Sequence, residues 1–277
     1  HITTSPHHHI TTSPHHHITT TPQHHITTSP HQHINTSTHP MKTHILFIAA
    51  HPDDVELCCA GTVFRHIEAG LTVGIADLTA GELGTRGNAQ LRAEEAARAS
   101  EIMGIAFREN LGLRDGFFDL GESNKLPIMR VIRKYRPEVV ITNAIRDRHP
   151  DHGRAAQLVS ESCFLAGLPK ISLEDAEGHV LEAWRPKQVY HMIQDRYIAP
   201  DICVDITPYI DKKTEAVMAF RSQFYDPLSA EPHTPISGLD FQEFLRARAR
   251  EMGRLIGVEY AEGYTMEGPV KKDNLLL

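Results

Sequence analysis

The chain has 277 residues and a formal net charge of −7, and hydrophobic residues make up 40% of it. No window approaches the roughly 20 apolar residues that a membrane-spanning helix needs, so we expect no membrane partner. An acidic chain without a long basic run also argues against a nucleic-acid groove. The four cysteines show no spacing typical of a disulfide framework or a zinc ribbon, which favours reduced thiols and a cytoplasmic location.

Residues 1–40 differ in composition from the rest of the chain. They contain no Asp, Glu, Lys or Arg, and they hold twelve of the 20 histidines in imperfect repeats punctuated by proline. Because so little apolar surface cannot offset the entropy lost on folding, we expect a disordered low-complexity tail. The tail lacks the basic segment and long apolar core of a secretory signal. Residues 41–277 suit one α/β domain.

The first half of this domain alternates between strand and helix patterns. Apolar runs predict strands at residues 45–50, 71–78, 109–113 and 138–143. Helical spacing predicts helices at residues 55–69, 89–103 and 126–135, and another helical pattern follows residue 152. This alternation is typical of a right-handed, mostly parallel sheet with helices on both faces. We therefore expect a Rossmann-like α/β fold.

The second half of the domain is less regular. Residues 167–187 look like an insertion, and strands are predicted at residues 188–194 and 202–206. Two helices, at residues 208–221 and 239–256, are expected to close the chain. Between them, residues 223–237 contain three prolines and suit either a wall of an active site or a contact in a homo-oligomer.

Two polar clusters follow predicted strands. His51-Pro52-Asp53-Asp54 comes directly after the first strand, and His149-Pro150-Asp151-His152 follows the strand at 138–143. In open α/β sheets, ligands bind at the carboxyl ends of the strands, where such side chains serve chemistry better than packing. Together the clusters supply enough imidazole and carboxylate to hold one metal ion and leave an acid and a base free.

The spacing within the clusters suggests a chemical role for each residue. We expect His51, Asp54 and His152 to bind the metal, because a catalytic site takes three protein ligands and leaves a position for water. Asp53 is then the general base that takes a proton from the water. His149 is expected to stabilise the oxyanion as an imidazolium or to protonate the leaving amine. Zn2+ is the expected cofactor, and Fe2+ accepts the same ligands.

A purely structural interpretation competes with the metal site. Asp53 or Asp54 would be a normal cap for the helix that follows, and for one cluster alone this explanation is about as strong. The occurrence of two such clusters at two strand ends favours the metal site.

Two further polar residues are candidates for substrate binding. Arg86 lies in the glycine-rich segment at residues 81–87, which lacks the spacing of a dinucleotide-binding loop. Its guanidinium could grip an anionic substrate group, or form a salt bridge with a helix carboxylate. Asp147 crowds the second cluster, where we expect it to contact the substrate or to orient a neighbouring group.

At these motifs the chain resembles the LmbE-like, or PIG-L, family of zinc-dependent N-acetylglucosamine deacetylases. Residues 81–87, 109–113, 147–153 and 260–263 are similar to the branch that deacetylates N-acetylglucosaminyl-malate during bacillithiol synthesis. The resemblance implies the same metal ligands, base and acid as above, with Arg86 near the substrate carboxylates. Some relatives, including those of mycothiol synthesis, place a Tyr where this chain has Asp147, which counts against a mycothiol role.

The sequence therefore predicts an enzyme that hydrolyses the N-acetyl group of an N-acetylglucosamine conjugate, with N-acetylglucosaminyl-malate as the preferred substrate. Chitooligosaccharides and thiol conjugates are alternative N-acyl sugars. A different class of function, a metal-binding protein whose working part is the His-rich tail, predicts several ions per chain. A nucleotide-binding domain would need a phosphate loop that the sequence does not contain.

Overall fold

The computed structural model describes residues 42–224 and 228–271. The expectation of a disordered tail at residues 1–40 lies outside these ranges. The strands are β1 (Ile45–Ala49), β2 (Val73–Asp77), β3 (Phe107–Asn110), β4 (Val139–Thr142), β5 (Gln188–Met192), β6 (Ile202–Asp205) and β7 (Ala261–Met266). The helices are α1 (Asp54–Glu68), α2 (Ala89–Met103), α3 (Glu122–Tyr135), α4 (Pro150–Ala166), α5 (Ile210–Met218) and α6 (Phe241–Ile256), with the 3-10 turn η1 (Thr207–Tyr209) before α5.

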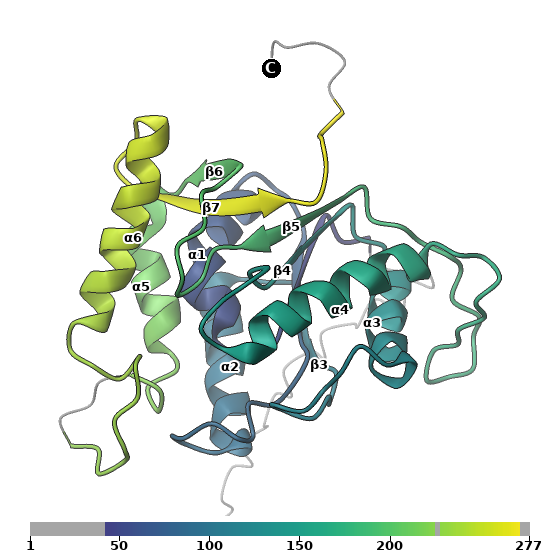
Figure 1. Cartoon of the computed structure of the whole chain (residues 1–277), viewed down its shortest axis with the longest axis horizontal. Coiled ribbons are helices and arrows are strands. Elements are labelled where there is room, and N and C mark those ends of the chain that lie inside the picture. Colours follow the sequence, from purple (N-terminus) through teal and green to yellow (C-terminus); the bar gives the residue numbers. More distant parts are fainter. Residues whose placement is uncertain (1–41, 225–227, 272–277) are drawn as a thin grey trace, which may run out of the picture. The chain divides into compact units, whose positions relative to one another are not determined.

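The strands form one mostly parallel sheet with the order β3-β2-β1-β4-β5-β7-β6. Figure 1 labels the β4-β5-β7-β6 part of this sheet. β1 pairs in parallel with β2 on one side and with β4 on the other. The chain runs outward from β1 through β2 to β3 and then crosses to β4, so the strand order reverses between β1 and β4. This reversal creates a crevice at the carboxyl ends of the two strands, which is the usual binding position in such sheets.

β1 is buried on both faces, as a central parallel strand must be. Ile45, Phe47 and Ala49 belong to the core cluster formed with α1, α2 and α5. The alternating residues Leu46 and Ile48 belong to the second cluster, with α3 and α4. Helices therefore cover both faces, and the expected Rossmann-like α/β fold is confirmed.

One strand was not predicted from the sequence. β7 inserts between β5 and β6 and is antiparallel to both. Its residues include Glu262 and Gly263, which are poor strand formers, so the local pattern is weak. The fold overrides this preference because the buried Glu262 carboxylate accepts hydrogen bonds from the backbone N–H of Gly61 at 3.1 Å and of Thr62 at 2.7 Å. Lys213 donates to the same carboxylate at 2.6 Å.

Several boundaries also differ from the prediction. β3 lies at residues 107–110 instead of 109–113, although the backbone N–H of Leu113 still bonds to the carbonyl of Leu78 at 2.8 Å. α3 begins at Glu122, four residues before the predicted start, because its first turn is polar and shows no helical spacing of apolar residues. The predicted helix at 208–221 is divided into η1 and α5. No helix in the described ranges is long and apolar enough to span a membrane.

Candidate metal centre

The turn between β1 and α1 has an unusual backbone at Asp53. This residue has a φ of 118°, which is rare for any residue except glycine, and it precedes the first residue of α1. Its side chain makes no capping hydrogen bond to the helix. The Asp53 carboxylate is therefore not used as a helix cap, and the structural interpretation fails for this residue. Backbone strain of this kind is concentrated at functional sites.

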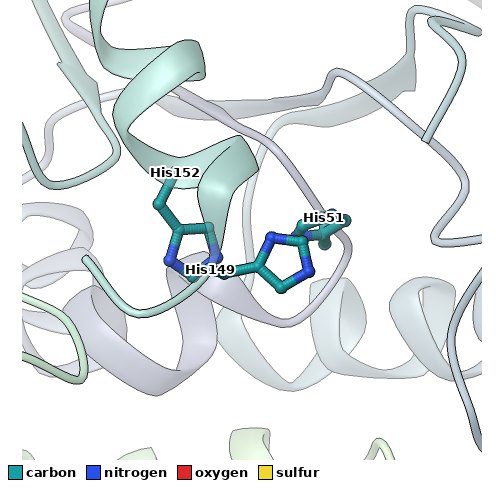
Figure 2. A group of neighbouring side chains, drawn as sticks. All are labelled: His51, His149 and His152. Carbon is teal, nitrogen blue, oxygen red and sulfur yellow. The ribbon is translucent and has the colours of Figure 1, made fainter. Parts of the chain in front are cut away.

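The two sequence clusters meet at the crevice between β1 and β4. One ring nitrogen from each of His51, His149 and His152 lies within 4.8 Å of the others (Figure 2). The rings of His51 and His149 meet edge to face, with centroids 4.7 Å apart. His149 and His152 stand on either side of the start of α4, at positions i and i+3, as the cluster spacing predicts.

Asp54 links the two clusters. One carboxylate oxygen lies 3.1 Å from Nε2 of His152, and the other lies 3.6 Å from Nδ1 of His51. The side-chain amides of Asn143 and Gln194 donate to the same carboxylate at 2.9 and 3.0 Å. Asp54 is thus held between the two imidazoles, where it could bind the same cation as they do.

The far nitrogen of each imidazole is held by another carboxylate. Asp147 accepts from Nδ1 of His152 at 2.6 Å, and Asp115 lies 3.0 Å from Nε2 of His51. Asp151 approaches the same His51 nitrogen at 3.5 Å. Such carboxylate partners orient metal-ligating histidines and make the free nitrogen more basic. They leave Nε2 of His152 and Nδ1 of His51 facing Asp54.

The charges in the cluster shift the pKa values of its members in opposite directions. Burial lowers the pKa of His152, but Asp54 and Asp147 outweigh it and raise the pKa to about 9. The pKa of His51 is likewise raised, because its bonds to Asp115, Asp151 and Asp54 outweigh burial. The pKa of Asp54 is held well below its usual range, because His152 and His51 outweigh the effect of burial.

Asp53 and His149 have the opposite shifts. Burial raises the pKa of Asp53 to about 6, although the nearby Arg92 lowers it. Burial and the neighbouring His51 and His152 lower the pKa of His149. Nδ1 of His149 accepts from the backbone N–H of Asp151 at 3.3 Å, so the neutral ring carries its proton on Nε2. The lowered pKa favours a neutral His149 that donates from Nε2, and its expected imidazolium form stays a prediction.

The two expected substrate contacts are placed differently. The Arg86 guanidinium is only 5% exposed and donates to the carbonyls of Ser222 at 2.9 Å and Pro232 at 3.4 Å, and to Ser229 at 3.1 Å. Its donors are directed to these three residues, and its Nε lies 3.7 Å from the Glu231 carboxylate. Asp147 lies buried behind His152, so its side chain orients a histidine instead of facing a substrate.

Sequence reasoning did not identify Asn143, Gln194, Asp115 or Arg92 as part of the site. Asn143 follows β4 and Gln194 follows β5, so their positions at strand ends could have identified them. Asp115 and Arg92 come from a loop and from α2, where no local pattern marks them.

The donor set suits a divalent metal ion. Nε2 of His152 and Nδ1 of His51 each face one oxygen of the Asp54 carboxylate, and each of the three side chains has a second hydrogen-bonding partner that fixes its direction. Zn2+ and Fe2+ both accept such ligands. A doubly wound sheet with this cluster at its switch point, beside a carboxylate that is not used as a helix cap, defines an α/β protein with a candidate metal-binding site.

Comparison with known proteins identifies relatives of this chain. Residues 46–163 match the model of the family PIG-L, described as GlcNAc-PI de-N-acetylase. A diacetylchitobiose deacetylase from Thermococcus kodakarensis is 28% identical over 229 residues, which cover 79% of this chain and 81% of the relative. A probable N-acetyl-alpha-D-glucosaminyl L-malate deacetylase 2 from Bacillus anthracis is 28% identical over 204 residues, 65% of this chain and 81% of the relative.

Among solved structures, a conserved protein from Thermus thermophilus is 36% identical with a TM-score of 0.74, and the match covers 85% of this chain and 99% of that one. The chain belongs to the PIG-L family, also called LmbE-like, a family of N-acetylglucosamine-type deacetylases.

Proposed function

We propose that this protein is a metal-dependent hydrolase that removes the acetyl group from the nitrogen of an N-acetylglucosamine conjugate. The observation that carries the proposal is the Asp53 carboxylate, which is not used as a helix cap and stands next to a His51, Asp54 and His152 cluster. Those three residues would hold the metal. When bound, a divalent cation polarises the amide carbonyl and makes a nearby water more acidic.

The residues around the metal would then divide the proton transfers. Asp53, with its pKa of about 6, is suited to accept a proton from the attacking water near neutral pH. His149 would donate a hydrogen bond from Nε2 to the oxyanion, and the proton taken up by Asp53 would pass to the amine nitrogen as the C–N bond breaks. Asp147 and Asp115 would keep His152 and His51 in the tautomers that present a free nitrogen to the metal.

The conjugate attached to the glucosamine is the finer part of the proposal. We propose N-acetylglucosaminyl-malate as the first substrate to test, because the motifs at residues 81–87 and 147–153 resemble that branch. Diacetylchitobiose is the second, because the relative from Thermococcus kodakarensis is named for it. The two differ in charge next to the reacting sugar, so they can be separated by parallel assays.

The test measures release of free amine from both compounds by the full chain. The unaltered protein, the protein after chelation, and the chelated protein with one equivalent of Zn2+ or Fe2+ are compared. The proposal expects activity that the chelator abolishes and a metal restores. Activity that survives complete removal of metal would overturn metal dependence, and lack of amine release from either compound by metal-loaded protein would overturn the substrate class.

The histidine-rich tail offers a separate function that the same preparation can test. A chain whose working part is residues 1–40 would bind several ions, and deleting those residues would remove its function. The deacetylase proposal expects about one tightly bound ion per chain, and full activity from a variant that lacks residues 1–40.

A further inference from the structure

A buried arginine lies directly behind Asp53. Arg92, from the first turn of α2, is 6% exposed, and its Nη1 stands 3.4 Å from the Asp53 carboxylate. The same nitrogen donates to the carbonyl of Pro52 at 3.0 Å, and Nη2 donates to the side chain of Gln223. One guanidinium therefore contacts two successive residues of the β1–α1 turn and is itself fixed from the opposite side.

The glycine-rich segment is shaped around this guanidinium. A Cβ atom at Gly81 would lie 2.9 Å from Nη1 of Arg92, and one at Gly84 would lie 3.4 Å from Nη2. Gly81 also has a φ of 63°, which favours glycine. The glycines at these two positions thus leave the space that Arg92 occupies, a role distinct from the phosphate binding for which glycine-rich loops are known.

Arg92 also explains the direction of the Asp53 side chain. An aspartate that precedes a helix normally turns its carboxylate to accept from the first backbone N–H groups. The Asp53 carboxylate accepts no such hydrogen bond, although Asp53 directly precedes the first residue of α1. Within the described ranges, Arg92 is the cation in contact with the Asp53 carboxylate, and the charge pair competes with capping.

We propose that Arg92 is a positioning residue for the reaction: it holds the Asp53 carboxylate away from the helix amides, so that the carboxylate is available to the attacking water. Gln223 supports it by fixing Nη2 of the guanidinium. This inference rests on the proposed role of Asp53 as the base. It adds a contact from α2 that neither sequence motif contains.

The test compares two buried arginines changed in the same way. Arg92→Lys keeps the positive charge but cannot contact Asp53, Pro52 and Gln223 together. Arg108→Lys is the matched control, because Arg108 is equally buried and pairs with Glu56 and Asp77 away from the metal ligands. We expect Arg92→Lys to lower kcat about tenfold to a hundredfold, with KM and metal content within twofold of the unaltered protein.

Arg108→Lys is expected to lower Tm at least as much as Arg92→Lys while kcat stays within about twofold. Two results would overturn the proposal. The first is an Arg92→Lys protein with kcat near the unaltered value. The second is an equal loss of kcat in both variants, because the loss would then follow from general destabilisation.

A second arm asks whether Arg92 acts through Asp53. Arg92→Lys is combined with Asp53→Asn, and residual kcat and Tm are measured for the single and double variants. If Arg92 acts through the carboxylate, its substitution lowers kcat and Tm less in the Asp53→Asn background than alone. Additive losses in Tm would overturn the proposal. The Tm comparison holds even if the unaltered protein releases no amine, a result that would count against the proposed function alone.

Discussion

Asp53 and Asp54 are adjacent and almost equally buried, yet the pKa values of their carboxyl groups are shifted in opposite directions. Burial raises the pKa of Asp53 to about 6, whereas His152 and His51 hold the pKa of Asp54 well below its usual range. The φ of 118° at Asp53 and the contact with Arg92 direct its carboxylate to a different partner from the two imidazoles that face Asp54. Pairs of acids with divided pKa values are typical of sites where one group binds and the other transfers protons.

The strain at Asp53 predicts a difference between two inactive variants. Asp53→Ala and Asp53→Gly both remove the carboxylate and leave Arg92 without it, but only glycine adopts a positive φ without strain. We expect Asp53→Gly to be more stable than Asp53→Ala by about 1 kcal/mol, or about 2–4 °C in Tm. Thermal unfolding of the two proteins at equal metal occupancy checks this. Equal Tm values would mean that the turn stores no strain.

The bond between Asp147 and His152 predicts a change in metal affinity. Asp147→Ala leaves all three proposed ligands in place but frees Nδ1 of His152. We expect metal affinity to fall about tenfold to a hundredfold, as is usual when such a partner is lost. Competition with a chromogenic chelator measures the affinity. If Asp147→Ala binds metal as tightly as the unaltered protein but has a raised KM, Asp147 contacts the substrate after all.

Metal binding should depend on pH in a defined direction. The pKa of His152 is raised from its ordinary value to about 9 in the metal-free protein, so the ring is protonated at pH 7. Metal must displace this proton, and affinity should rise by about tenfold per pH unit for each displaced proton up to about pH 9. Titration calorimetry at pH 6.5, 7.5 and 8.5 in two buffers counts the protons released. Affinity that does not change with pH would contradict the assignment.

The same shift has a consequence for the stability of the metal-free fold. A pKa raised on folding adds stability that is fully present below the unfolded value, near 6.5, and is lost as pH rises through about 9. The Tm of chelated protein should therefore fall as the pH rises from about 6.5 to about 9. Metal-loaded protein, whose ring is bound to metal instead of a proton, should lose less.

A substitution of Arg86 tests whether its guanidinium binds other residues of the chain or the substrate. Because it donates to Ser222, Ser229 and Pro232, we expect Arg86→Met to loosen the chain at these three residues and to speed proteolysis there. Any rise in KM should then be similar for N-acetylglucosaminyl-malate and for the uncharged diacetylchitobiose. A rise confined to the malate compound would instead assign Arg86 to the substrate carboxylates.

The sequence predicted the parts of this molecule that depend on local pattern. Strand ends at residues 50 and 143 could be read from apolar runs, and because parallel strand ends meet at one edge, His51 and His152 were expected to converge. The partners of Arg86 lie 136 or more residues away, so no local pattern could distinguish a carbonyl oxygen from a substrate carboxylate. β7 was missed for the same reason, because its Glu262 is explained only by distant amides on α1.

The role of Asp53 as the base is tested most directly by the turnover of Asp53→Asn with its metal in place. We expect this variant to bind about one ion, as we expect of the unaltered protein, and to release amine at least about a hundredfold more slowly from N-acetylglucosaminyl-malate or diacetylchitobiose. Asp54→Asn, measured in parallel, should lose the ion itself. Near-normal turnover by metal-loaded Asp53→Asn would contradict the assignment of Asp53 as the base.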